Sequence, residues 1–181
     1  MLRPEAVAIC RVWVCRSRFK ATLGGLEQAP AHASHIGQER AEEIGETLPK
    51  LVDACKREDV TLPSSFLRFM GTPRLHAPIR SNTDAFLDLP LAPVASPMGD
   101  AQLVRLLADS QGCLFWYLFL PTGVSDHAVV CSTDFYRPEG EDFYGSDEEA
   151  GIGDRDPCAL LFGAESLEAF LCRFWNENEL W

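Results

Sequence analysis

Residues 126 to 134 combine the side-chain types of a nucleophilic active site. His127 lies four residues before Cys131, and Asp126 and Asp134 flank the pair, so a base, a thiol nucleophile and an orienting acid are close in sequence. The apolar residues between His127 and Cys131 predict a β-strand, on which residues four apart face the same side at a separation of about 13 Å. Because no hydrogen bond spans that distance, we interpret both side chains as structural and predict no enzymatic activity. A small hydrolase using Cys131 is the alternative that the pattern leaves open.

A second group, His32, His35, Glu39 and Glu43, has the helical spacing that could place metal ligands on one face. The histidines, however, belong to a stretch with a proline, several small residues and no apolar period, which indicates a loop. The acid-rich residues 138–157 could offer carboxylates to calcium, but they lack the alternating Asp or Asn and glycine pattern of an EF-hand loop. No Cys-x-x-Cys occurs among the seven cysteines. We therefore predict neither a metal nor a cofactor.

The charge of the chain is uneven and indicates the kind of partner. Residues 1–90 carry 12 Lys and Arg against 11 Asp and Glu, whereas residues 91–181 carry 4 against 16. At long range such a second half repels a polyanion and attracts a cationic protein. We therefore expect a basic protein partner and no direct binding of nucleic acid.

Many of these acids lie in the segment 138–157, among several glycines, and Phe143 and Tyr144 are embedded between them. Such a segment can be a solvated acidic loop and nothing more. Alternatively, its aromatic residues anchor a partner inside a charged rim that steers a basic target. On the second interpretation, the candidate partner-binding residues are Glu139, Glu141, Asp142, Phe143, Tyr144, Asp147, Glu148 and Glu149.

Four stretches of the chain are expected to be loop or helix. Residues 24–37 should be a loop, and residues 38–55 show a helical period that Pro49 should break into two helices. Residues 62–70 should begin a helix after Leu62-Pro63, and residues 100–109 place leucines and a valine on a helical face. A last helix should follow Ser166, which can cap its exposed amides.

Three stretches are expected to form strands. Residues 83–89 are short and end before a proline, and residues 111–120 form a run too apolar for a strand with one wet face. Residues 127–131 are a second apolar run after a turn, so the two runs should pair as antiparallel strands. Trp116 lies within the first of these runs, and we predict a core position for it and not a ligand pocket.

The 181 residues, of which 46% are hydrophobic, are enough to bury the core of one globular domain. The longest strongly apolar run, residues 113–121, is far shorter than the roughly 20 residues that cross a membrane as a helix. Basic residues interrupt the apolar residues at the N-terminus, so we expect no secretory signal and a cytoplasmic protein.

Four of these stretches, taken in order, resemble the SUKH superfamily, which includes fungal cell-wall synthesis regulators and many bacterial proteins. They are Leu62-Pro63-Ser64-Ser65-Phe66, the run from Asp109 to Leu118, the apolar strand that follows it, and the terminal Ser166-Leu167-Glu168-Ala169-Phe170-Leu171. Leu62-Pro63, Trp116 and Phe170 match the family's early helical part, mid-domain strand and closing helix. The resemblance implies a single α+β domain, with a curved antiparallel sheet packed by helices and no catalytic activity.

The resemblance covers roughly residues 40–178. It implies a SUKH-like domain over residues 37–181, with residues 138–157 as an acidic loop, and leaves residues 1–36 as an N-terminal extension without a counterpart. Bacterial members of the family are regarded as immunity proteins that neutralise toxins, often nucleases. We therefore expect a non-enzymatic immunity protein that binds a toxin through an acidic surface. A regulatory or scaffolding module that recognises an endogenous protein is the alternative, because fold resemblance does not decide function.

Overall fold

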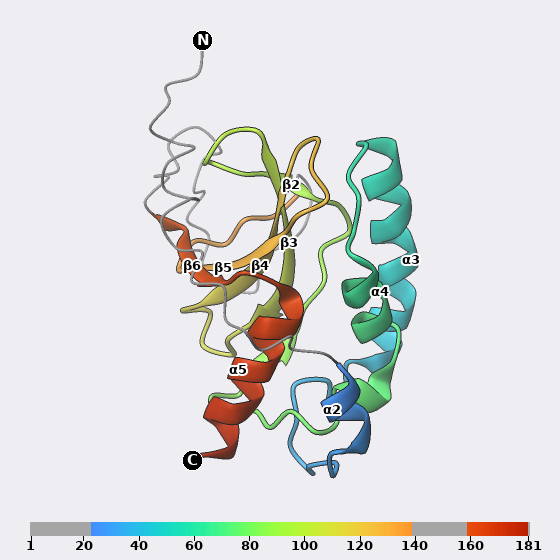
Figure 1. Cartoon of the computed structure of the whole chain (residues 1–181), viewed down its shortest axis with the longest axis vertical. Coiled ribbons are helices and arrows are strands. Elements are labelled where there is room, and N and C mark those ends of the chain that lie inside the picture. Colours follow the sequence, from blue (N-terminus) through green and yellow to red (C-terminus); the bar gives the residue numbers. More distant parts are fainter. Residues whose placement is uncertain (1–22, 139–158, 181) are drawn as a thin grey trace.

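The computed structural model describes residues 23–138 and 159–180, and these form one α+β domain (Figure 1). The predicted acidic loop therefore lies outside the described residues, except for Pro138. The elements, in chain order, are α2 (Gly24–Gln28), α3 (Ala41–Arg57), α4 (Ser64–Met70), the 3-10 helix η1 (Pro73–Leu75), β1 (Phe86–Leu87), β2 (Val94–Ala95), β3 (Ala101–Ala108), β4 (Phe115–Pro121), β5 (Ala128–Ser132), β6 (Leu161–Ala164) and α5 (Leu167–Glu179).

The six described strands form one antiparallel sheet in the order β1-β3-β4-β5-β6, and β2 also pairs with β3. Strands β4 and β5 confirm the predicted antiparallel pair, with Trp116 opposite Cys131. Side chains alternate cleanly along β4, because Phe115 and Tyr117 belong to a smaller cluster while Leu118 and Leu120 belong to the main core. Strand β4 is therefore covered on both faces, as the continuous apolar run of residues 111–120 predicted.

The helix predicted for residues 100–109 is wrong, because β3 occupies this stretch at the centre of the sheet. Its register against β4 shifts between Arg105 and Leu107, so Leu106 is an extra residue in the strand. This bulge lets the consecutive Leu106 and Leu107 both enter the main core. The resulting apolar spacing departs from strict alternation, which is why periodicity indicated a helix.

The predicted break near Pro49 is also wrong, since α3 continues through the proline over its whole length. The residues that α3 buries include Ile44, Leu51 and Cys55, whereas Pro49 and Gly45 are exposed. The carbonyl group that loses its hydrogen bond to the proline belongs to Gly45, and at an exposed position water can replace that bond. The apolar face of α3 packs on the core and maintains the helix despite the proline.

Residues 24–28 form the short helix α2, so the loop predicted for residues 24–37 is wrong over this part. Leu23, Leu26 and Ile36 are buried members of the main core. The described part of the predicted N-terminal extension therefore packs with the rest of the domain.

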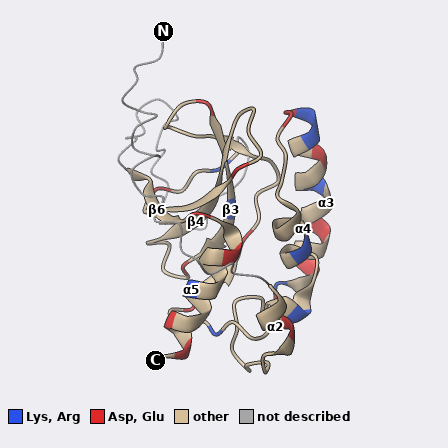
Figure 2. Ribbon diagram, viewed as in Figure 1, with Lys and Arg blue, Asp and Glu red and all other residues tan. Residues whose placement is uncertain are grey.

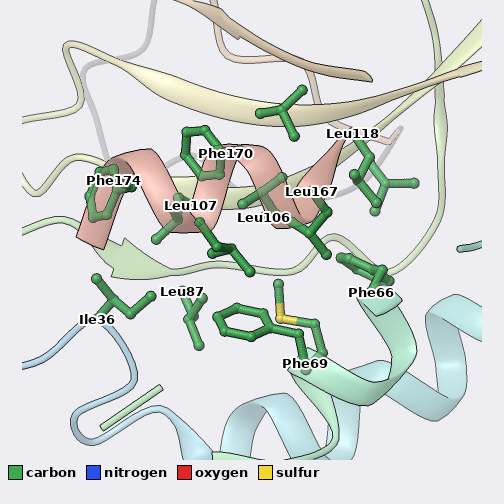
Figure 3. Packing of buried hydrophobic residues seen from close by; sticks show 14 of the residues in the cluster. Ile36, Phe66, Phe69, Leu87, Leu106, Leu107, Leu118, Leu167, Phe170 and Phe174 are labelled. Carbon is green, nitrogen blue, oxygen red and sulfur yellow. The ribbon is translucent and has the colours of Figure 1, made fainter. Parts of the chain in front are cut away.

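The main core lies where the helices meet one face of the sheet. Figure 3 shows Phe66 and Phe69 of α4 and Phe170 of α5 approaching Leu106 and Leu107 of β3. Full burial of each such side chain stabilises the fold by about 1.5–3 kcal/mol. Helices α4 and α5 confirm their predictions, and the position of α5 against this core forms the site described next.

Candidate functional site

A cleft of about 660 Å³ lies beside α5 and is lined by residues of β4, β6 and the loop that precedes β1. Four aromatic residues contribute to its wall: Trp116, Phe162, Phe170 and Phe174. The cleft is open to solvent, and its size falls within the range of roughly 300–1,000 Å³ found for ligand sites. The lining is mainly apolar, as in sites that receive an apolar side chain or ligand.

The local structure explains why these aromatic residues meet. Phe170 and Phe174 are four residues apart on α5, so they share one face of the helix. Trp116 alternates with Tyr117 along β4 and therefore faces the side of the sheet where α5 packs. Its ring lies edge-on to Phe174, with centroids 5.8 Å apart and planes at 82°, and 6.4 Å from Phe170. Trp116 is only partly buried and lines the cleft, so the prediction of a purely core position is incomplete.

Hydrogen bonds hold one end of the cleft in place. Asn178 is buried, its Nδ2 donates to the Phe174 carbonyl at 2.8 Å, and its Oδ1 accepts from the Asn82 backbone amide at 3.1 Å. The side chain of Asn82 donates in turn to the Asn178 carbonyl at 2.6 Å. The end of α5 and the loop before β1 are thus joined in both directions, which preorganises this wall.

The two charged residues of the cleft differ in their partners. The guanidinium group of Arg173 donates from Nη1 to the Gly163 carbonyl at 2.6 Å, which fastens α5 to β6. Glu177 lies one helical turn further along α5 and forms no hydrogen bond or ion pair with any residue of the described ranges. The cleft therefore presents one positive and one negative side chain, of which Glu177 alone has no hydrogen-bond or ion-pair partner within the described ranges.

Strand β6 continues the apolar surface at the edge of the described sheet. Leu161 is 61% exposed and Phe162 is 50% exposed, which is unusual for large apolar residues in a strand. Gly163 lies at a register shift against β5, and a Cβ atom there would come within 3.0 Å of the Val129 carbonyl oxygen. A glycine is therefore needed for β6 to approach β5 this closely.

All eight residues first predicted to bind a partner lie outside the described ranges. They are Glu139, Glu141, Asp142, Phe143, Tyr144, Asp147, Glu148 and Glu149. The described acidic residues do not gather on one patch, because Figure 2 shows them on α3, on loops and near both ends of α5. Within the described part of the chain, the candidate site is thus mainly apolar, with one arginine and one glutamate.

His127 and Cys131 do not form a catalytic pair in this arrangement. The Nε2 atom of His127 accepts a hydrogen bond from the Leu167 amide at 3.2 Å, at the first turn of α5. Burial lowers the pKa of His127, against the opposing influence of Glu168 and Asp126, and burial raises the pKa of Cys131. A thiol nucleophile needs a lowered pKa, so the geometry and the protonation state both disfavour the hydrolase alternative.

The histidines and glutamates considered above as metal ligands do not come together in the described residues. His32 pairs with Glu179 at 2.8 Å, whereas Glu43 pairs with Arg40. His35 accepts a backbone amide hydrogen bond, and its pKa is lowered by burial and by the neighbouring His32. Within residues 23–138 and 159–180, no cluster of three or more His, Cys, Asp or Glu could hold a metal ion.

The sequence analysis overlooked a buried cation on the opposite face of the sheet. Arg105 is 2% exposed and donates from Nε to Asp88 at 2.6 Å and from Nη1 to the Tyr136 carbonyl at 3.2 Å. The Tyr117 hydroxyl donates to the Asp134 carbonyl at 2.9 Å and accepts from the Tyr136 amide at 3.0 Å, and burial raises the pKa of Tyr117. These contacts satisfy buried polar groups, so we assign Arg105 a structural role. A lone arginine inside an apolar run was the signal that could have indicated it.

A scan against protein-family models finds no match for this chain, and neither curated proteins nor solved structures yield one. The resemblance to the SUKH superfamily therefore stays a prediction. None of the helices in the described ranges is both long and apolar enough to pass through a membrane.

Proposed function

We propose that this chain is a non-enzymatic domain that binds a basic protein partner. The observation that carries the proposal is the open aromatic cleft beside α5, next to the exposed Leu161 and Phe162. Protein-binding sites typically concentrate their energy in a few aromatic contacts that are shielded from water by a polar rim. The walls of the cleft are held by α5, β4 and β6, so a partner side chain would meet a largely preformed site.

The acidic balance of the chain supports a cationic partner. The net charge is −11, and the segment 139–158 carries most of this excess in sequence. Long-range attraction by such a charge raises the rate at which a basic protein approaches and weakens with added salt.

In its narrower form, the proposal is that the chain acts as a cytoplasmic immunity protein that neutralises a toxin, for example a nuclease. Two points support this form: the ordered resemblance to the SUKH superfamily, and the fact that a nuclease must expose a basic surface to bind its polyanionic substrate. Occupation of that surface by an acidic protein would exclude the substrate.

The test is co-expression of the full chain with a toxin domain encoded beside its gene, followed by measurement of the Kd at increasing salt concentration. We expect a complex whose affinity falls as salt rises, together with loss of toxin activity. A toxin domain that remains active in the presence of the chain would contradict the immunity form. A salt-sensitive complex with an endogenous protein alone would instead support the regulatory alternative.

A further inference from the structure

We propose, beyond the protein-binding function above, that the cleft beside α5 binds a free aromatic α-amino acid. The ring of the ligand packs against Trp116, its carboxylate accepts hydrogen bonds from the guanidinium group of Arg173, and its ammonium group pairs with the carboxylate of Glu177. The apolar wall and the two opposite charges select this ligand together.

Three rings form the apolar wall on the α5 side of the sheet. Phe174 lies edge-on to Trp116 with centroids 5.8 Å apart, and Phe170 lies 5.6 Å from Phe174. Phe170 and Phe174 are buried, whereas Trp116 is only partly buried and lines the cleft, so its ring keeps apolar area in contact with water. An aromatic ring packed against Trp116 would remove this area from water and extend the edge-to-face cluster.

The strand register decides which exposed residues of β6 share this face. Leu161 lies opposite Cys131, which in turn lies opposite Trp116, whereas Phe162 lies opposite Val130. Residues directly opposite each other in an antiparallel pair share one face of the sheet. Leu161 is therefore on the Trp116 side, and the Phe162 side chain is on the other face. The ligand ring is accordingly placed against Trp116 and not against Phe162.

The charges in the lining are balanced. Among the described residues that line the cleft, Arg173 and Glu177 are the charged ones, and the other polar side chains, Asn82, Thr83 and Asn178, are neutral. A ligand with a single charge would be attracted by one of the two and repelled by the other, whereas a zwitterion is attracted by both. The lining therefore favours a ligand with one positive and one negative group.

Arg173 and Glu177 do not neutralise each other, although they are one helical turn apart. They form no ion pair with each other, and an arginine four residues before an acid is the less favourable order on a helix. Nη1 of Arg173 donates to the Gly163 carbonyl, but a guanidinium group has five N–H donors, so others remain for a carboxylate. At this spacing the two Cβ atoms are about 5–6 Å apart. A head group with both charges on one carbon atom can therefore lie between the two side chains.

The same two charges favour a free amino acid over a residue of a protein chain. An α-amino acid carries its ammonium and carboxylate groups on one carbon atom, and each peptide bond removes one of these charges. An aromatic residue at a chain terminus would therefore meet only one of Arg173 and Glu177, and a residue inside a chain would meet neither.

The probe for the test is phenylalanine, added to the full ¹⁵N-labelled chain and followed by NMR at a pH of about 6, where α-amino groups are protonated. Trp116→Phe identifies the Trp116 indole signal among the four tryptophans. We expect phenylalanine to shift this signal in a saturable way. Alanine, which lacks the ring, should bind at least about tenfold more weakly.

Two substitutions combined with two analogues test the charges one at a time. Arg173→Gln should weaken phenylalanine binding about threefold but leave the affinity for phenylalanine amide, which lacks the carboxylate, unchanged. Glu177→Gln should weaken phenylalanine binding about threefold but should not weaken binding of 3-phenylpropionate, which lacks the ammonium group. Arg74→Gln on η1 and Glu46→Gln on α3, both at exposed positions, are the controls of equal charge change and should leave phenylalanine binding unaltered. Because the net charge of −11 attracts any cation, the criterion is the response of each ligand to the substitutions and not the order of affinities.

Several results would overturn the inference. They are the absence of a saturable shift at Trp116, equal binding of alanine and phenylalanine, and equal weakening by the control variants. If Arg173→Gln weakens phenylalanine and its amide equally, the guanidinium group acts only by fastening α5 to β6, and the proposed contact is wrong. If sedimentation shows a dimer that Arg173→Gln and Glu177→Gln dissociate, the occupant of the cleft is a second copy of the chain. These measurements need no partner protein, so their outcome is separate from that of the protein-binding function.

Discussion

At the scale of single residues, the buried imidazole of His76 makes the fold sensitive to pH. The imidazole is 1% exposed, and its Nε2 lies 2.7 Å from the Phe69 carbonyl, while Nδ1 has no hydrogen-bond partner among the residues that the structure describes. The Phe69 ring lies edge-on at 4.8 Å. Burial is the main cause that lowers the pKa of His76 to about 4. The neutral form is therefore the one that the folded chain accommodates.

Acidification should destabilise the fold through this residue. The folded pKa is lower than the unfolded value near 6.5, so the unfolded chain binds the proton more readily and stability falls as pH drops from about 6.5 to about 4. A shift of this size corresponds to roughly 3 kcal/mol in the free energy of unfolding. Urea unfolding across this pH range measures the loss. In His76→Gln the slope should be smaller, and an unchanged slope would assign the pH dependence to other groups.

The packing of the backbone against the His76 imidazole can be tested at Gly37, with Gly45 as a control that lies away from the ring. A Cβ atom at Gly37 would lie 2.6 Å from the Cβ atom of His76, whereas one at Gly45 on α3 would meet nothing within 4 Å. Gly37→Ala should therefore lower the free energy of unfolding by about 1–3 kcal/mol. Gly45→Ala should raise it by about 0.5–1 kcal/mol, because alanine favours the helix. Denaturant titration of both variants measures the difference, and equal effects would contradict this account of Gly37.

At the scale of elements, local patterns predicted those strands and helices whose residues follow a single regular pattern. Strand β4 is a continuous apolar run, and Ser166 accepts a hydrogen bond from the Ala169 amide as the predicted cap of α5. The same reasoning failed for strand β3, because the bulge at Leu106 interrupts the alternation of its side chains between the two faces of the sheet. The cleft could not be predicted either, since Trp116 and Phe174 meet only when β4 and α5 pack together.

Helix α3 should gain stability when its internal proline is removed. Pro49 deprives the Gly45 carbonyl of its helical hydrogen bond, and its position is exposed, so the substitution leaves the core untouched. We expect Pro49→Ala to raise the free energy of unfolding by about 1–2 kcal/mol, part of the proline penalty of about 3 kcal/mol. Thermal unfolding followed by circular dichroism at the helical band measures the change. A lower Tm in the variant would show instead that the proline is favourable at this position.

At the scale of the whole molecule, the excess of negative charge should affect folding and binding in opposite directions. With a net charge of −11, the compact state suffers self-repulsion that added salt screens, so the Tm should rise by a few degrees between about 0.05 and 0.5 M NaCl. Over the same range the affinity for a basic partner should fall, because the attraction between unlike charges is screened too.

Measurements in an uncharged osmolyte of equal osmolality separate screening from general effects on the solvent, since the osmolyte leaves charge interactions nearly unchanged. A Tm that falls with NaCl would mean that favourable ion pairs, such as Arg105 with Asp88, outweigh the net repulsion. An affinity that is insensitive to salt would place the binding energy in the apolar cleft alone. The salt dependences of the Tm and of the affinity together therefore separate the contribution of long-range charge to binding from that of the aromatic contacts beside α5.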